Sequence, residues 1–248
     1  MEPEQRFCGL AESYGRFRPD YPACALDWII AYGQLTAGSL MIDLGAGTGI
    51  ASRAFAARGL RVIGIEPNDE MRARALQQGG PEAIDYRQGS AEATGLPAEI
   101  ADLVLAAQAF HWFKPDRALA EAYRVLKERG CLALLWNERD LEDPFTSAYG
   151  DLVRAFPDAR EVESVRQEAG HHLLESTRFR EARRQEFEHF QLASLEELIG
   201  RTFSASYAPR DPVVVEKAGD DLRQLFRTHE REGCVVIRYR TSVYIARR

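Results

Sequence analysis

The most constraining feature of the sequence is a glycine-rich turn that follows a short apolar segment, within residues 40–49. The run LMIDL ends at position 44, and glycines follow at 45, 47 and 49. Glycine adopts positive φ at little cost and lets a ligand approach the backbone closely. An apolar run before such a turn is typical of a buried strand that leads into a helix. The segment therefore predicts the first βα unit of a nucleotide-binding α/β domain.

Strand and helix patterns alternate along the following hundred residues. We expect strands at 61–66, 83–88, 102–107 and 131–136, with helices between them, and we expect Gly130 to end the helix that starts at Pro115. Strict alternation predicts a doubly wound, mostly parallel sheet. Two later segments, 186–192 and 234–246, have strand-like composition and would complete a seven-stranded Rossmann-like sheet.

The chain is expected to form one domain with four segments. Its length of 248 residues suits a single α/β domain that carries an insertion. We predict an N-terminal flap and helix at 1–35, a cofactor-binding βαβ core at 36–136, a helical lid at 137–185 and a C-terminal completion of the sheet at 186–248. The lid should close over the site together with the N-terminal flap.

Composition and charge exclude several classes of protein. The formal net charge is −6, which argues against binding to nucleic acid or to an anionic membrane surface. No apolar run approaches the roughly 18 residues that span a bilayer, and the N-terminus does not resemble a signal peptide. The four cysteines are scattered, so we expect reduced thiols in a cytoplasmic protein and no metal site.

Two acidic residues narrow the choice of ligand. Glu66 ends the second predicted strand, where a carboxylate usually accepts hydrogen bonds from ribose hydroxyls. Asp43 lies just before the glycines, where it would repel a pyrophosphate but suit an ammonium group. The turn has the spacing G-x-G-x-G and not the dinucleotide spacing G-x-G-x-x-G, and no phosphate-binding G-x-x-x-x-G-K-[ST] loop is present. An adenosine with a zwitterionic sulfonium tail therefore fits better than a diphosphate.

At these residues the sequence resembles the class I S-adenosylmethionine-dependent methyltransferases of the methyltransferase type 11 group. The resemblance rests on DLGAGTG at 43–49, GIEP at 64–67 with Met71 after it, GSAE at 89–92 and QAFHWF at 108–113. Two further stretches, YGRFRPDYP at 14–22 and YRTSVYIAR at 239–247, are similar to trans-aconitate methyltransferase-like small-molecule methyltransferases. The resemblance implies a methyl transfer from S-adenosyl-L-methionine to a small molecule by in-line displacement.

The resemblance also implies a role for each matching position. The turn would hold the methionine part of the cofactor, Glu66 the ribose hydroxyls and Met71 the adenine, while Arg18 could pair with the methionine carboxylate. The complete predicted cofactor site is Arg18, Asp43, Gly45, Ala46, Gly47, Thr48, Gly49, Glu66, Pro67, Met71, Ser90, Ala91, Glu92 and Gln108.

The acceptor and the catalytic groups stay open at this stage. His111 or Tyr14 could act as the general base for a phenol, alcohol or amine, whereas a carboxylate nucleophile needs no base. His111 could equally be a structural residue among aromatic neighbours. An acidic substrate would require arginines, and several are available. The alternatives to a methyltransferase are an NAD(P)-dependent oxidoreductase and a non-catalytic cofactor-binding protein, and a monomer or homodimer is expected.

Overall fold

The computed structural model describes residues 9–81 and 84–248, and within them seven strands form one sheet. The strands are β1 (Leu40–Leu44), β2 (Arg61–Ile65), β3 (Ile84–Arg87), β4 (Ala101–Ala107), β5 (Leu126–Arg139), β6 (Arg180–Ala193) and β7 (Val235–Arg247). Their order is β3-β2-β1-β4-β5-β7-β6. Strands β1 to β5 pair in parallel, and β7 runs antiparallel to both β5 and β6. The predicted seven-stranded, mostly parallel sheet is confirmed.

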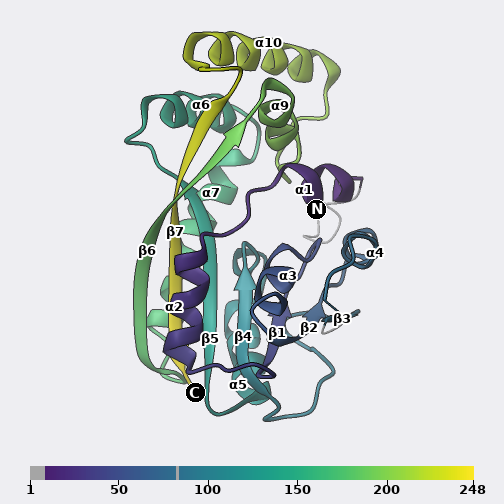
Figure 1. Cartoon of the computed structure of the whole chain (residues 1–248), viewed down its shortest axis with the longest axis vertical. Helices are drawn as coiled ribbons and strands as arrows, with labels where there is room; N and C mark the ends of the chain where they lie inside the picture. Colours follow the sequence, from purple (N-terminus) through teal and green to yellow (C-terminus); the bar gives the residue numbers. More distant parts are fainter. Residues whose placement is uncertain (1–8, 82–83) are drawn as a thin grey trace.

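Helices cover both faces of the sheet, so the fold is doubly wound (Figure 1). The described helices are α1 (Ala11–Phe17), α2 (Ala23–Gly33), α3 (Ile50–Ala56), α4 (Asp69–Gln77), η2 (Phe110–Trp112), α5 (Pro115–Val125), α6 (Pro144–Arg154), α7 (Ala159–Ala169), α8 (His171–Leu174), α9 (Leu195–Phe203) and α10 (Pro212–His229). Side chains of α2 and α3 pack in one apolar core with the sheet, and side chains of α5 and α8 pack in another.

Strand β1 lies inside the sheet between β2 and β4. A strand that is covered on both faces needs apolar side chains at successive positions. Met41, Ile42 and Leu44 are all buried, and Asp43 is buried between them. This position explains the continuous apolar run in the sequence and makes the single carboxylate in it exceptional.

A third apolar core lies beyond the carboxyl edge of the sheet and belongs to a separate layer, which we call the cap. The cap comprises α6, α7, α9 and α10 with the adjoining ends of β6 and β7 (Figure 1). In the first half of β7, Val235, Ile237 and Tyr239 are buried, while the residues between them are more exposed. This alternation is that of a strand with one face on a core and one face in solvent.

The N-terminal segment lies between the cap and the rest of the molecule. Helix α1 contacts both α9 and α4. Side chains of the sheet hold the end of α1 and the segment after it: Gln191 Nε2 donates to the Phe17 carbonyl at 3.0 Å, and Asn137 Nδ2 donates to the Asp20 carbonyl at 2.8 Å. Helices α6, α7 and α8 fall within the predicted lid at 137–185. The division into four segments stays a prediction.

Two strands begin earlier than the sequence predicts: β5 begins at Leu126 and not at 131, and β6 begins at Arg180 and not at 186. The helix that begins at Pro115 ends at Val125, and Gly130 lies within β5 and not at a helix end. Strand β5 starts early because Leu126 pairs with Ala101, after which the register shifts until Cys131 pairs with Leu103. The extra residues form an irregularity that includes Arg129 at φ +70°. Such a bulge cannot be recognised from hydrophobic periodicity.

Three negative observations apply to the described residues, 9–81 and 84–248. Among them, no helix is long and apolar enough to cross a membrane. Within the same ranges, no group of three or more His, Cys, Asp or Glu side chains is arranged to hold a metal ion. The thiols of Cys24, Cys131 and Cys234 are free, and Cys8 lies outside the described ranges.

Candidate functional site

The glycine-rich turn joins β1 to α3, and each of its three glycines adopts positive φ. The φ angles are +67° at Gly45, +57° at Gly47 and +82° at Gly49. A Cβ at Gly45 would lie 2.8 Å from the Ala109 Cβ, and one at Gly49 would collide with the Tyr86 hydroxyl. A Cβ at Gly47 would meet nothing closer than 4.0 Å. Gly45 and Gly49 are therefore needed for packing, whereas Gly47 leaves open space beside the backbone.

Asp43 is a buried carboxylate next to this turn, with an exposed fraction of 1%. Ser52 on α3 donates to Asp43 Oδ2 at 2.6 Å. Among the residues that the structure describes, none hydrogen-bonds to Oδ1, which is also buried. Burial, supported by the charge of Glu66, raises the pKa of Asp43 to about 7, although the Ser52 hydrogen bonds oppose the shift. A cationic donor at Oδ1 would stabilise the ionised form.

Glu66 follows β2 and points back to the turn. Gly47 N–H donates to Glu66 Oε2 at 2.8 Å, and Asn68 N–H donates to Oε1 at 2.9 Å. Asn68 also caps α4, because its side chain accepts from the Met71 N–H. Two backbone donors thus fix the carboxylate at the carboxyl edge of the sheet, where ligands of open α/β sheets bind.

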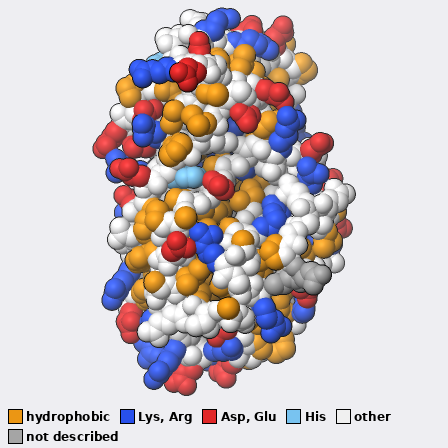
Figure 2. Space-filling model, viewed as in Figure 1, with side chains coloured by type: hydrophobic (Ala, Val, Ile, Leu, Met, Phe, Trp, Pro, Cys, Tyr) orange, Lys and Arg blue, Asp and Glu red, His pale blue; other side chains and the backbone are white. Residues whose placement is uncertain are grey.

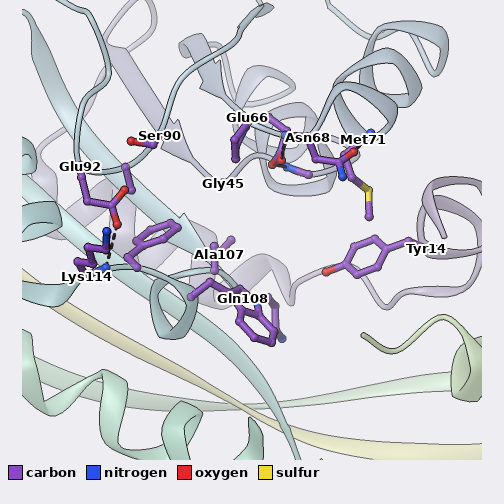
Figure 3. A pocket seen from close by; sticks show the side chains of 16 residues that line it. Tyr14, Gly45, Glu66, Asn68, Met71, Ser90, Glu92, Ala107, Gln108 and Lys114 are labelled. Carbon is purple, nitrogen blue, oxygen red and sulfur yellow. Dashed lines mark hydrogen bonds between the residues drawn. The ribbon is translucent and has the colours of Figure 1, made fainter. Parts of the chain in front are cut away.

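These groups border a cavity of about 240 Å³, which we call the turn cavity (Figure 3). The Tyr14 hydroxyl points into the cavity from the side opposite Glu92 and Lys114 (Figure 3). The lining residues are Tyr14, Gly45, Gly47, Glu66, Pro67, Asn68, Met71, Ser90, Ala91, Glu92, Ala107, Gln108, Ala109, Trp112, Phe113 and Lys114. A smaller adjoining recess is lined by Tyr14, Tyr21, Asp43, Gly45, Ala46, Gly47, Thr48, Ile50, Ala51 and Ala107.

The structure gathers most of the predicted site residues around these two spaces, and three lie elsewhere. Gly49 is the N-cap residue of α3. Arg18 is outside both linings: its guanidinium carbon lies 4.4 Å from the centroid of the Tyr14 ring, and it donates to the Ser204 carbonyl at 3.1 Å. His111 is on η2 and outside both linings.

The surroundings of His111 define its chemistry. Trp136 Nε1 donates to His111 Nδ1 at 3.3 Å. Burial, together with the charges of Arg166 and Arg18, lowers the pKa of His111 to about 3. The imidazole is therefore neutral at physiological pH, and its Nδ1 lone pair already accepts a hydrogen bond. This geometry favours a structural role, and a catalytic role for His111 stays a prediction.

Gln108 ends β4 in a conformation that non-glycine residues rarely adopt. Its φ is +57°, and its backbone N–H donates to the Leu135 carbonyl at 2.7 Å. Gln108 Nε2 donates to the Asn137 carbonyl at 3.4 Å. Backbone strain of this kind is often found at ligand sites. It turns the chain so that the residues after Gln108 line the cavity.

Sequence reasoning did not assign a site role to Asn68, Lys114, Trp112 or Phe113, all of which line the turn cavity. Asn68 carried a usable signal, because an asparagine before a helical segment is a typical N-cap and so lies at the edge of the sheet. The sequence around Lys114 gave no such signal, because a long-range contact positions this residue: its backbone N–H donates to Glu92 Oε1 at 2.8 Å.

Comparisons with known proteins agree with this geometry. A family model described as "Methyltransferase domain" matches residues 42–134. An uncharacterized methyltransferase of Mycobacterium tuberculosis is 34% identical over 224 residues, which cover 90% of this chain and 86% of that protein. The range that the family model matches includes the lining residues from Gly45 to Lys114.

Solved structures show the same fold. A protein from Anaeromyxobacter dehalogenans, described as a type II methyltransferase, has a TM-score of 0.64 at 26% identity over 93% of this chain and 97% of that chain. Phosphoethanolamine N-methyltransferase 2 of Haemonchus contortus, in complex with S-adenosyl-L-methionine, has a TM-score of 0.54 at 15% identity. That match covers 99% of this chain and 57% of the other.

Proposed function

The chain belongs to the class I S-adenosylmethionine-dependent methyltransferases, and on this premise we propose that it transfers a methyl group from S-adenosyl-L-methionine to a small-molecule acceptor. The observation that carries the proposal is the pair of buried carboxylates, Asp43 and Glu66, on either side of the open backbone at Gly47. An NAD(P)-dependent oxidoreductase is not favoured, because a pyrophosphate beside Asp43 would place like charges together in a buried site.

The residues present fit the cofactor in three ways. The unpartnered Oδ1 of Asp43 suits the ammonium of the methionine part. Glu66 suits the ribose hydroxyls, although it must then share its oxygens with the N–H groups of Gly47 and Asn68. Met71 and Ala91 are buried apolar residues in the lining that suit the adenine ring. When bound, S-adenosyl-L-methionine supplies an electrophilic methyl group on a sulfonium.

The chain itself contributes position and exclusion of water. In-line attack requires the acceptor atom to be held near 3 Å from the methyl carbon, and such positioning can supply several kcal/mol. The segment from Gln108 to Phe113 is fixed by Gln108 on one side and by the Trp136–His111 hydrogen bond on the other. Tyr14 lies across the cavity from this segment and is the second group proposed to orient the acceptor or take its proton.

Two observations support a small acceptor: how the site is covered, and how charge is distributed on the surface. The cap and α1 lie over the carboxyl edge of the sheet (Figure 1). Figure 2 shows acidic and basic side chains interspersed over one face of the molecule, without a basic field that would track a nucleic acid.

Calorimetric titration tests the proposal. S-Adenosylhomocysteine, the demethylated product of the cofactor, should bind with micromolar or tighter affinity, and NAD should not bind. The full chain with S-adenosyl-L-methionine and a panel of metabolites should then release S-adenosylhomocysteine in an acceptor-dependent manner. Binding of NAD without binding of S-adenosylhomocysteine would overturn the cofactor assignment, and cofactor binding without turnover on any small acceptor would favour a non-catalytic protein.

A further inference from the structure

A tyrosine of β3 fills the space beneath the glycine-rich turn. Tyr86 pairs with Gly64 of β2 in the parallel register of the two strands. A Cβ at Gly64 would overlap the Tyr86 ring, and a Cβ at Gly49 would overlap its hydroxyl. The two glycines therefore leave a slot that the Tyr86 side chain occupies. Because Gly49 is outside both cavity linings, the third glycine of the turn is required for this packing and not for contact with a ligand.

The Tyr86 side chain ends close to Ser52 and Asp43. Burial raises the pKa of Tyr86, Ser52 and Arg53 oppose the rise, and the charge of Asp43 adds to it. The phenol is therefore uncharged at physiological pH. Its oxygen is buried, and no residue in the described part of the chain hydrogen-bonds to it. Tyr86 thus contributes the volume of its ring at this place and not a hydrogen bond.

Ser52 connects this packing to the acidic residue of the turn. It lies on α3, which contacts β3, and its side chain is buried. Ser52 Oγ donates its one hydrogen to Asp43 Oδ2 at 2.6 Å. A serine hydroxyl rotates among several positions unless its neighbours restrict it. The Tyr86 ring, which is packed against the start of α3 at Gly49, supplies such a restriction.

The hydrogen bond from Ser52 determines which oxygen of Asp43 is available to a ligand. Oδ2 is occupied by Ser52, whereas Oδ1 accepts no hydrogen bond from residues 9–81 and 84–248. Asp43 borders the recess next to the turn cavity. Burial and the charge of Glu66 favour a protonated Asp43, and Ser52 opposes both effects through its side chain and its backbone. Ser52 therefore favours an ionised carboxylate with Oδ1 free.

From these contacts we infer that Ser52 is a positioning residue, which holds the Asp43 carboxylate with Oδ1 toward the ammonium of the cofactor, and that the Tyr86 ring keeps Ser52 in place. The inference rests on the proposed function, because it concerns the same cofactor site. Ser52 is outside both linings, so it acts through Asp43. Without its hydrogen bond, Asp43 keeps its proton to higher pH and pairs less well with a cation.

The affinity for S-adenosylhomocysteine, measured against pH, tests the inference. Ser52→Ala should bind it about tenfold more weakly than the parent chain at pH 6 but within about twofold at pH 8.5, where Asp43 is ionised in both proteins. A serine with only a structural role would weaken binding by the same factor at both pH values. That equal loss, or no loss at pH 6, would overturn the inference. Ser164→Ala, at an exposed position on α7, is the matched control and should bind as the parent chain does.

A carbon-13 NMR titration of the Asp43 carboxyl group tests the same contact in the ligand-free chain. Its midpoint should rise by about one pH unit in Ser52→Ala, because the hydrogen bond stabilises the ionised form. An unchanged midpoint would refute the role of Ser52. Failure of S-adenosylhomocysteine to bind the parent chain at any pH would instead refute the proposed function, and the titration would still decide the role of Ser52. The two failures are therefore distinguishable.

Substitutions of Tyr86 test the role of its ring. Tyr86→Leu removes the ring and should raise the titration midpoint of Asp43, in the same direction as Ser52→Ala. Tyr86→Phe keeps the ring without the hydroxyl and should restore the midpoint to within about 0.3 pH unit of the parent value. An unchanged midpoint in Tyr86→Leu, or a shift in Tyr86→Phe as large as that in Ser52→Ala, would show that the ring does not keep Ser52 in place.

Discussion

The turn cavity and the cap hold their buried charges in different ways. Asp43 and Glu66 receive hydrogen bonds from Ser52, Gly47 and Asn68, all within about 20 residues of their partners in the chain. Around the cap, Arg18, Arg139, Arg166 and Arg201 come from distant parts of the chain, and among the described carboxylates Glu163 forms an ion pair with Arg139. The hydrogen bonds of the first region join residues that are close in the sequence, whereas the second region depends on contacts between distant parts of the chain. The difference predicts that substitutions affect cofactor binding on one side and stability or acceptor binding on the other.

The largest expected effect is on cofactor affinity. Glu66→Ala removes the acceptor of the Gly47 and Asn68 N–H groups together with the proposed ribose ligand. Hydrogen bonds to a charged group contribute about 1.5–3 kcal/mol each, so affinity for S-adenosylhomocysteine should fall about 100-fold. Isothermal calorimetry measures this change, and Glu188→Ala, at an exposed position on β6, is the control. An unchanged affinity in Glu66→Ala would show that the Glu66 carboxylate does not bind the cofactor.

In the cap, a substitution should instead change the free energy of unfolding. Glu163→Gln removes the carboxylate that pairs with Arg139, whose side chain is 8% exposed. Breaking a buried ion pair on one side costs about 3 kcal/mol, because the remaining charge is left unpaired. Denaturant unfolding should therefore show a loss of this size, with little change in affinity for S-adenosylhomocysteine.

Glu168→Gln, on the exposed side of the same helix, is the matched control for that measurement. Full stability in Glu163→Gln would mean that the cap is not short of negative charge. The contrast between the two regions would then fail.

The same contrast explains what could be predicted from the sequence. The turn, the strand before it and Glu66 are local patterns, because glycine at positive φ and a carboxylate at a strand end leave a signature within about 25 residues. Thirteen of the predicted residues line the two spaces, and twelve of these lie in the short motifs that carry the resemblance. The thirteenth, Tyr14, is placed there by the packing of α1. The positions of Arg18 and His111, outside the linings, likewise depend on long-range contacts.

The arginines around the cap could not be predicted in this way. An arginine in a helix or at a strand end has no local feature that distinguishes a solvated side chain from a buried one. Arg139 and Arg166 become neighbours only because α7 packs on η2 and β5 ends beneath the cap. The sequence suggested arginines for an acidic substrate, but the choice among them required the tertiary structure.

A smaller effect is expected from Asp43, and it depends on pH. Pairing with the ammonium of the ligand favours the ionised carboxylate, whose pKa in the free protein is raised to about 7 by burial. Binding below pH 7 must therefore release a proton, so affinity for S-adenosylhomocysteine should fall up to about tenfold per pH unit from 7 to 5 and level off above 7. Asp43→Asn should abolish this dependence and bind about tenfold more weakly at pH 8.

The pH dependence of stability tests the protonation of the Asp43 carboxyl group independently of ligand binding. The folded chain holds a proton on Asp43 that the unfolded chain releases near pH 4, so this group lowers the free energy of unfolding as pH rises from about 4 to 7. In Asp43→Asn that contribution is absent, and the variant should gain stability relative to the parent chain over the same range. Parallel pH profiles for the two proteins would contradict the buried, unpaired state of Oδ1.

The smallest effect is expected from a substitution at the N-terminus of α9, a helix of the cap. Ser194 and Glu197 form a capping box on α9, the helix that carries Arg201: Ser194 Oγ accepts from the Glu197 N–H at 3.3 Å, and Glu197 Oε2 accepts from the Ser194 N–H at 2.8 Å. Ser194→Ala should cost about 1 kcal/mol of stability, and Ser194→Thr, which keeps the hydroxyl, should cost less. Because α9 also contacts α1, fraying of its first turn should raise the KM for the acceptor in Ser194→Ala while the affinity for S-adenosylhomocysteine stays unchanged. A matching loss of cofactor affinity would mean that the two regions are one cooperative unit, and the division between the turn cavity and the cap would have to be abandoned.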